Sequence, residues 1–321
     1  MGVTTGTIAS RPSKGVGRMA TAAGRSDAVD GVLLFDKPVG VTSNAALQRL
    51  KRLYLAAKAG HAGTLDPLAS GLLPICFGEA TKFSGDLLDA DKAYHATIKL
   101  GRTTTTGDRE GTIIEQCAAD GVTDAAIARV LAGLTGEIEQ VPPMYSALKH
   151  RGRPMYAYAR AGITIDRAPR SVTIRRIEAG ARRGDELDIR VMCSKGTYIR
   201  VLAEDIGRAL GVGASIQTLR RVALGTLDVS AAHTFEQLEQ MTDAGRMDRL
   251  QAVDSMLLAL PKVVLDRAQA IGFCHGRRVL RTDRNANGKV RVYGPDERFL
   301  GAGTLDGDQL TPLRLIAGLQ R

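Results

Sequence analysis

Residues 60–74 read Gly-His-Ala-Gly-Thr-Leu-Asp-Pro-Leu-Ala-Ser-Gly-Leu-Leu-Pro, with one acidic side chain, that of Asp66. The glycines before it permit a tight loop. Because Pro67 suits the first turn of a helix, one interpretation makes Asp66 the N-cap of that helix. The other interpretation starts from the surrounding leucines, which would partly desolvate the carboxylate. A desolvated carboxylate stays ionised only beside a cation or hydrogen-bond donors, and these must come from another part of the chain.

The composition indicates a protein with two parts and a polyanionic partner. At 321 residues the chain is long for one domain, and an apolar content of 44% is enough for a substantial core. Lys and Arg number 44 against 34 Asp and Glu, and the net charge of +10 attracts nucleic acid or an anionic membrane. The sequence has no apolar run long enough to span a bilayer, so nucleic acid is the better candidate.

The cysteines and the first thirty residues bear on the cellular compartment. The four cysteines lie far apart without a Cys-x-x-Cys spacing, which argues against zinc and disulfides and favours a reducing cytoplasm. Residues 1–30 are rich in small and polar residues, with bases and no acid before Asp27, as is typical of a disordered basic tail. Residues 15–20 within it imitate a dinucleotide-binding fingerprint, but no strand precedes them, so we dismiss that site.

Hydrophobic periodicity predicts strands and helices around the Asp66 loop. A buried strand is expected at 31–35, and an amphipathic helix with a basic outer face is expected from Ser43. Alternation predicts a half-buried strand at 92–100 with Tyr94 pointing inward. That tyrosine is either an ordinary core residue or a plate on which a base stacks.

Two further stretches complete this part of the chain. The polar run 101–111 is expected to be a loop without core potential, and Thr123 is expected to cap a plain core helix. A clean strand at 187–193 leads into another helix, with Tyr198 and Arg200 at the junction. Such junctions often present functional side chains, so Arg200 is a candidate cation for Asp66.

The segment 144–183 carries ten bases against two acids, with three tyrosines among them. It is either a solvated loop or a surface that neutralises phosphates and stacks on bases, and its composition favours RNA. Beyond Pro261, short strands separated by turns predict a compact all-β module, which suits a binding domain or a structural appendage. The bases of the segment are Lys149, Arg151, Arg153, Arg160, Arg167, Arg170, Arg175, Arg176, Arg182 and Arg183.

Five short motifs follow one another along the chain: Asp36-Lys37-Pro38, Gly60-His61-Ala62-Gly63-Thr64-Leu65-Asp66-Pro67, Gly78-Glu79-Ala80-Thr81-Lys82, Lys92-Ala93-Tyr94 and Ser194-Lys195-Gly196-Thr197-Tyr198-Ile199-Arg200. In this combination the chain closely resembles the bacterial TruB family, the tRNA pseudouridine-55 synthases. The resemblance covers residues from 31 to about 321. It implies an α+β pseudouridine-synthase fold, with a mixed, mainly antiparallel central sheet flanked by helices and a small C-terminal β-barrel that is PUA-like.

The resemblance also implies a division of the chain and a set of partners. After the tail (1–30) we expect a catalytic domain (31–258) with an RNA-gripping insertion at about 142–183, and a PUA-like RNA-binding domain (259–321). The expected partner is tRNA, bound through its T-arm and T-loop. No cofactor and no metal ion are expected, and the family resemblance implies a cytoplasmic monomer.

Three side chains are expected from the resemblance to carry the chemistry. Asp66 would be the catalytic carboxylate and Arg200 its salt-bridge partner, while Tyr198 would lie near C5 of the base and assist proton removal. The substrate-binding set comprises Tyr198, His61, which would fill the space left in the T-loop by the extruded nucleotide, Tyr94, which would stack on the uracil, and Leu219, which would help line the uridine pocket.

Pseudouridine formation requires these residue types on chemical grounds as well. The reaction breaks the bond from C1′ to N1 of uracil and joins C1′ to C5, so it needs one ionised carboxylate rather than the two carboxyl groups of most glycosidases. Attack on C1′, attack on C6 and removal of a C2′ proton all remain open as the first step. The alternatives are a non-catalytic RNA-binding protein or tRNA-folding chaperone, and a metal- or nucleotide-dependent enzyme.

Overall fold

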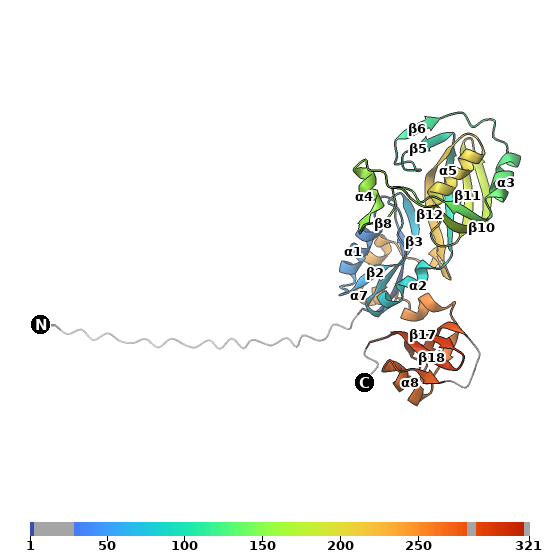
Figure 1. The fold of residues 1–321 in the computed structure, drawn as a ribbon. Helices are drawn as coiled ribbons and strands as arrows, with labels where there is room; N and C mark the ends of the chain where they lie inside the picture. The colour runs from blue at the N-terminus through green and yellow to red at the C-terminus, as the bar shows by residue number, and fades with distance from the viewer. Residues whose placement is uncertain (3–28, 281–286, 318–321) are drawn as a thin grey trace.

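A mixed β-sheet forms the larger unit of the computed structural model, which describes residues 1–2, 29–280 and 287–317 (Figure 1). In spatial order its main strands are β1 (Gly31–Lys37), β3 (Ala69–Phe77), β12 (Ala214–Leu224), β4 (Lys92–Leu100), β11 (Glu186–Cys193), β10 (Arg170–Arg183) and β7 (Gly136–Gln140). Two short strands extend it, β2 (Ala59–His61) beside β3 and β13 (Leu227–Asp228) beside β12. The pair β3 and β12 is parallel and the other described pairs are antiparallel, so the predicted mixed, mainly antiparallel sheet is confirmed.

Three amphipathic helices cover one face of this sheet: α1 (Ser43–Leu53), α3 (Asp124–Gly133) and α5 (Ile199–Ala209). Their apolar stripes pack on the inward residues of the strands, Tyr94 among them, in one continuous core. Thr42 and Thr123 cap the first two helices with their hydroxyl oxygens, which satisfies backbone N–H groups at each start. The helices predicted from Ser43 and after Thr123 are therefore confirmed.

Shorter elements pack on the opposite face and complete the unit. A second core cluster there joins β1 and β3 to short helices that follow the sheet strands. These elements are η1 (Gly78–Lys82), α2 (Ser84–Leu88), η2 (Val229–Ala231) and η3 (Val253–Leu257). Two other short helices, α6 (Phe235–Gln240) and α7 (Asp243–Met247), lie on the side of α1: Phe235 and Leu238 belong to the first core, and the Arg246 carbonyl accepts from the Tyr54 hydroxyl. Among the described residues, no helix has both the length and the apolar character needed to cross a bilayer.

Two sequence predictions in this unit need correction. The run 101–111 is not a loop outside the core, because β5 (Arg102–Thr104) pairs with β6 (Ile113–Gln116) and Asp108 is buried between them and the sheet. The basic segment 144–183 is not one insertion, since β10 belongs to the central sheet. The part outside that sheet contains β8 (Lys149–His150), β9 (Arg153–Pro154) and α4 (Met155–Arg160).

The C-terminal unit is smaller and lies below the larger one in Figure 1. Its sheet has the order β14 (Lys262–Val264), β16 (Gly288–Tyr293), β17 (Phe299–Asp306), β18 (Gln309–Leu315) and β15 (Val279–Leu280). The module is not all-β as predicted, because α8 (Arg267–Cys274) buries Phe273 in its core. Phe83 packs on Phe299 across the junction, with ring centroids 5.5 Å apart. The predicted tail and the run 15–20 lie largely outside the described residues.

Gly71 should be irreplaceable in the parallel contact between β3 and β12. Its φ is +102°, and a Cβ at this position would collide with the backbone carbonyl of Arg221. We expect Gly71→Ala to lower the free energy of unfolding by about 2 kcal/mol or more, because backbone strain and overpacking add. Gly133→Ala is the matched control, since Gly133 ends a helix with open space around it. Equal denaturation midpoints for the two variants would contradict this expectation.

Candidate active site

The Asp66 loop is held from outside and does not begin a helix. The chain enters β3 at Ala69, whose N–H bonds to the Asp66 carbonyl at 3.1 Å, so the N-cap interpretation is wrong. Ser43 at the start of α1 fixes the preceding residue: its hydroxyl donates to the Leu65 carbonyl at 3.0 Å and accepts from the Leu65 N–H at 2.8 Å. These buried bonds fix the backbone directly before Asp66.

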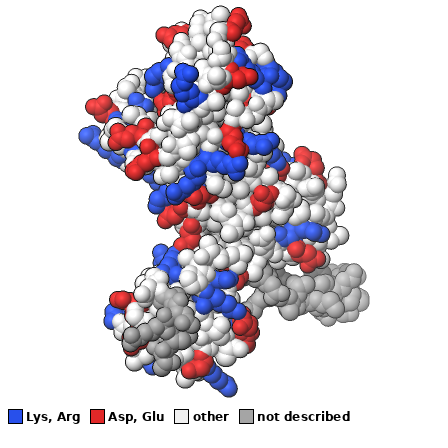
Figure 2. Space-filling model, turned by 90° about the vertical axis from the view of Figure 1, so that its right-hand side faces the viewer, with Lys and Arg blue, Asp and Glu red and all other residues white. Residues whose placement is uncertain are grey.

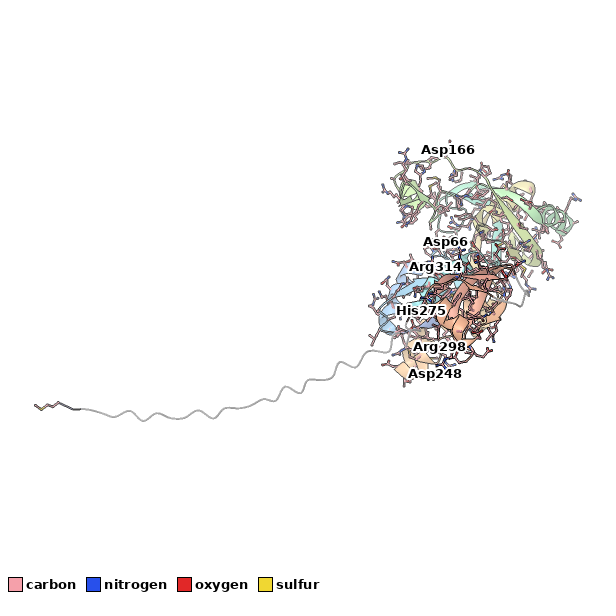
Figure 3. All side chains as sticks on the ribbon, turned by 60° about the horizontal axis from the view of Figure 1, so that its bottom comes forward. Asp66, Asp166, Asp248, His275, Arg298 and Arg314 are labelled. Atoms are coloured by element: carbon pink, nitrogen blue, oxygen red, sulfur yellow. The ribbon has the colours of Figure 1, made fainter. Side chains whose placement is uncertain are left out.

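The cation that the sequence required for Asp66 is Arg200. Its Nε donates to Oδ2 of Asp66 at 3.0 Å, and the exposed fractions of the two side chains are 5% and 38%. Arg200 lies in the first turn of α5, and Asp66 lies inside the larger unit, away from Asp166 at its outer end (Figure 3). The predicted ion pair is therefore present, with the carboxylate partly open and the guanidinium buried.

The remaining donors of Arg200 reach two other segments. Nη1 donates to the Thr106 carbonyl at 2.7 Å and Nη2 to the Tyr145 carbonyl at 2.6 Å. A second carboxylate, that of Asp108, lies 3.7 Å from Nε and is 7% exposed. Asp108 was missed by the sequence analysis because it falls in the polar run 101–111. The side-chain hydroxyl of Thr106 donates to its Oδ1 at 2.6 Å, a local turn bond that gives no sign of a distant arginine.

A hollow of about 250 Å³ opens beside this ion pair. Asp66, Tyr94, Tyr198, Arg200 and Leu219 all line it, so five of the six predicted site residues meet there. His61 does not line it. It lies on β2, and its buried Nδ1 has no hydrogen-bond partner among the described residues. Burial and the nearby Arg221 lower the pKa of His61.

Two buried basic residues near the hollow had no role, or only a supporting one, in the sequence analysis. Arg221 lines it from β12, where its Nε donates to the Leu72 carbonyl at 2.8 Å and its Nη2 to the Gly63 carbonyl at 3.1 Å. It thereby holds both arms of the Asp66 loop. Lys37 is buried as well, with its Nζ donating to the carbonyls of Pro38 and Val41 at 2.8 and 2.7 Å. Burial lowers the pKa of Lys37 to about 8, while the charge of Asp66 opposes that shift.

The curated relatives of the chain decide its family. A protein of Burkholderia mallei named tRNA pseudouridine synthase B is 53% identical over 297 residues, which cover 90% of this chain and 97% of that protein. One of Aromatoleum aromaticum with the same name is 55% identical over 290 residues, covering 90% and 93%. The chain belongs to the TruB family. Models of the TruB pseudouridylate synthase N-terminal domain, the tRNA pseudouridylate synthase B C-terminal domain and the pseudouridine synthase II TruB C-terminal region match residues 51–199, 200–265 and 261–316.

Solved structures agree with the TruB assignment at the level of the fold. The chain is similar to one in "Crystal Structure of a Cbf5-Nop10-Gar1 Complex", with a TM-score of 0.69, 26% identity, and coverage of 89% of this chain and 85% of that one. A chain in "Structure of H/ACA RNP bound to a substrate RNA containing 2'-deoxyuridine" gives a TM-score of 0.66 at 24% identity, covering 89% and 84%. The pseudouridine-synthase fold expected from the sequence is confirmed.

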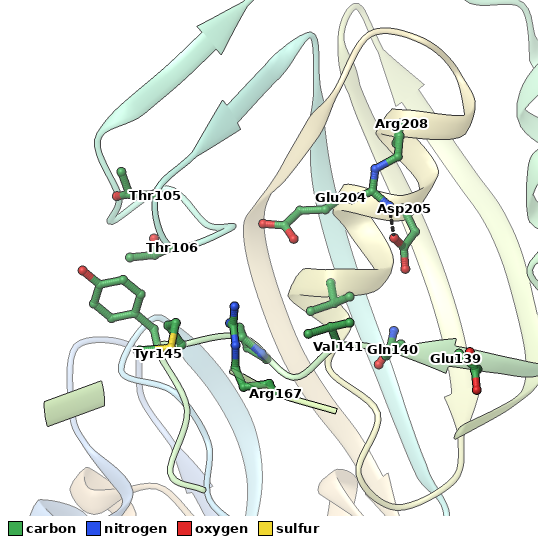
Figure 4. Close-up of a pocket in the computed structure, with 13 residues that line it drawn as sticks. Thr105, Thr106, Glu139, Gln140, Val141, Tyr145, Arg167, Glu204, Asp205 and Arg208 are labelled. Atoms are coloured by element: carbon green, nitrogen blue, oxygen red, sulfur yellow. Dashed lines mark hydrogen bonds and ion pairs between the residues drawn. The ribbon is translucent and has the colours of Figure 1, made fainter. Parts of the chain in front are cut away.

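A second hollow of this TruB family chain, of about 430 Å³, adjoins the Thr106 and Tyr145 backbone that binds Arg200 (Figure 4). Its walls carry Glu204 and Asp205 of α5, and burial raises the pKa of both carboxyl groups. Its lining has three acidic side chains, Glu139, Glu204 and Asp205, against the two arginines Arg167 and Arg208, so it offers a polyanion no excess of positive charge. It contains none of the six predicted site residues, so the chemistry is sought beside Asp66.

Lys37 should make the stability of the fold depend on pH above neutrality. The folded chain loses this proton before the unfolded chain does, because burial lowers the pKa of Lys37 from 10.5 to about 8. The free energy of unfolding therefore rises between about pH 8 and 10.5, where the unfolded state binds more protons. We expect Lys37→Met to remove this rise, as measured by thermal melting across the same pH range. Lys58→Met, at an exposed lysine, is the control, and parallel melting curves for the parent and Lys37→Met would refute the assignment.

Proposed function

We propose that this chain isomerises the uridine at position 55 in the tRNA T-loop to pseudouridine, with Asp66 as the catalytic carboxylate. The main support is that Asp66, 38% exposed, is held by the buried Arg200 at the mouth of a hollow that also contains Tyr94. Relatives named tRNA pseudouridine synthase B, more than half identical over most of the chain, support tRNA as the substrate.

The reaction needs no group beyond those in the hollow. The bond between C1′ and N1 breaks, the uracil turns, and C1′ joins C5. The C5 proton is lost and N1 gains one, so atoms and charge balance. Arg200 forms an ion pair with Asp66 in a partly buried site, and a carboxylate held in this way is suited to act as a nucleophile or base. Attack on C1′, attack on C6 and removal of the C2′ proton each fit this arrangement.

The detached base has to be held while it turns. Tyr94 offers an aromatic face that stacks on uracil without fixing its rotation, and Leu219 supplies an apolar wall. Tyr198 lies in the same lining, and burial raises the pKa of its phenol, so the hydroxyl is protonated at neutral pH. It therefore assists removal of the C5 proton as a relay rather than as a phenolate: the phenol accepts that proton while its own passes to water, and water supplies the proton that N1 gains.

The RNA is held in two ways: basic side chains bind its phosphates, and one side chain fills the space that the flipped uridine leaves. Exposed basic side chains of the segment between β7 and β10 lie beside two tyrosines. The guanidinium of Arg153 lies 5.3 Å from the ring centroid of Tyr158, and that of Arg160 lies 5.5 Å from the ring centroid of Tyr156. On the face drawn in Figure 2, Lys and Arg form a band across the middle of the molecule. In this proposal His61, which lies outside the hollow on β2, fills the vacated stack of the T-loop. The PUA-like unit (259–321) extends the RNA contact, and the enzyme acts as a cytoplasmic monomer.

Asp66→Asn tests the reaction and separates it from its alternative, a non-catalytic RNA-binding protein or tRNA-folding chaperone. Release of tritium from an unmodified T-arm transcript labelled at C5 of its uridines measures each turnover. We expect the variant to lose about 10³-fold or more in rate, because Asp66 is the one carboxylate among the described residues that line the hollow, while T-arm binding changes little. No release by folded parent protein would leave the chaperone as the function.

Arg151→Gln combined with Arg153→Gln tests the gripping segment. If each side chain neutralises one phosphate, the slope of log binding constant against log salt becomes shallower by about 1 to 2 units. Titration of the T-arm hairpin between low and physiological salt measures it. Arg129→Gln with Arg249→Gln removes two exposed arginines from α3 and from the residues after α7, and this control should keep the parent slope. An unchanged slope in the first variant removes the segment from the interface.

A further inference from the structure

The side chain of Gln140 makes a pair of hydrogen bonds to the backbone at the start of α5. Its Oε1 accepts from the Tyr198 N–H at 3.0 Å, and its Nε2 donates to the Tyr198 carbonyl at 3.4 Å. The reversed amide would set donor against donor, so the two contacts fix its orientation. Gln140 ends β7 beside the helix that carries Glu204 and Asp205 (Figure 4), and it is 3% exposed.

Helix α5 depends on this outside partner because its own N-cap cannot supply one. The N-cap residue is Tyr198, whose side chain makes no capping bond. A rigid phenol cannot fold back on its own helix as Ser or Asp does. Gln140 therefore binds the first backbone groups of the helix from a neighbouring strand, and it limits how the first turn moves and rotates.

That first turn carries two residues of the proposed reaction, Tyr198 and Arg200. The segment that begins with Gln140 also contacts the start of α5 a second time: the Tyr145 carbonyl accepts from Nη2 of Arg200 at 2.6 Å. The strand end thus binds the helix backbone, and the chain five residues later binds the helix side chain. Both contacts fix the direction from which Nε of Arg200 meets Asp66.

We infer that Gln140 is a positioning residue for the Arg200 and Asp66 pair, an inference that rests on the proposed function. Gln140 does not line the hollow beside Asp66, and its side chain is too deeply buried to contact bound RNA. It acts through the backbone of Tyr198. Its loss lets the first turn of α5 shift, and a displacement of about 1 Å between reacting groups costs on the order of 100-fold in rate.

Gln140→Met tests the inference with a side chain of similar size and no polar atoms. The matched control is Gln237→Met, because Gln237 also uses its amide at a helix start, where its Oε1 accepts from the Thr234 N–H at 2.9 Å. Single-turnover tritium release from a T-arm transcript gives the rate and the half-saturating enzyme concentration. We expect Gln140→Met to lose about 10- to 100-fold in rate with less than about a threefold change in half-saturation, and the control to keep both.

A second readout does not depend on turnover. The ¹⁵N-correlated Nε–H signal of Arg200 reports its bond to Asp66, and it should move in Gln140→Met and stay in Gln237→Met. If Gln140→Met does not fold, Gln140→Glu keeps the acceptor for the Tyr198 N–H, and it should lose rate by a smaller factor. A folded variant with the parent rate and signal overturns this inference alone, whereas a parent without tritium release overturns the proposed function and this inference with it.

Discussion

The structure depends on the solvation of one buried guanidinium, that of Arg200. Taking such a cation out of water is costly unless each donor finds an acceptor, and its planar fork can serve several at once. The acceptors come from three segments far apart in the chain: the Asp66 loop, the run that contains Thr106 and Asp108, and the segment around Tyr145. The fold brings these segments together, and none of them completes the site alone.

The two carboxylates beside Arg200 differ in a way that assigns their parts. Asp108 is 7% exposed; its Oδ1 accepts from the Thr106 hydroxyl and the Glu110 N–H, and its Oδ2 faces Nε of Arg200 at 3.7 Å in a buried position. Asp66 is 38% exposed, and Arg200 supplies its one side-chain bond among the described residues. The pair is therefore unequal: Asp108 balances the buried charge, and Asp66 keeps an oxygen free to meet a substrate.

Local sequence predicted the residues whose placement depends on their own strand or helix. Alternation placed Tyr94 inward, and the junction after β11 placed Tyr198 and Arg200 at a helix start, because period and turn chemistry decide such features. The predicted helix at Pro67 does not form, because pairing of β3 with β1 and β12 outweighs a local capping preference. Asp108 and Arg221 could not be found, since Asp108 meets Arg200 far along the chain and the two carbonyls that bind Arg221 lie 149 and 158 residues from it. Helix α8 had a readable signal, the capping box of Asp266 and Gln269, which the strand pattern around it obscured.

The segment after β7 joins a group of exposed basic side chains to the Asp66 site through one hydrogen bond. Tyr145 supplies one carbonyl to Arg200, and the bases from Lys149 to Arg160 follow in the same excursion from the sheet. In the proposed function, RNA bound to these basic side chains would therefore act on a segment that also supplies an acceptor to Arg200. A buried cation that lost the Tyr145 carbonyl without compensation would bear the full cost of an unmade charged hydrogen bond. The segment proposed to grip the RNA and the carboxylate proposed to react are thus both bound to one guanidinium, that of Arg200.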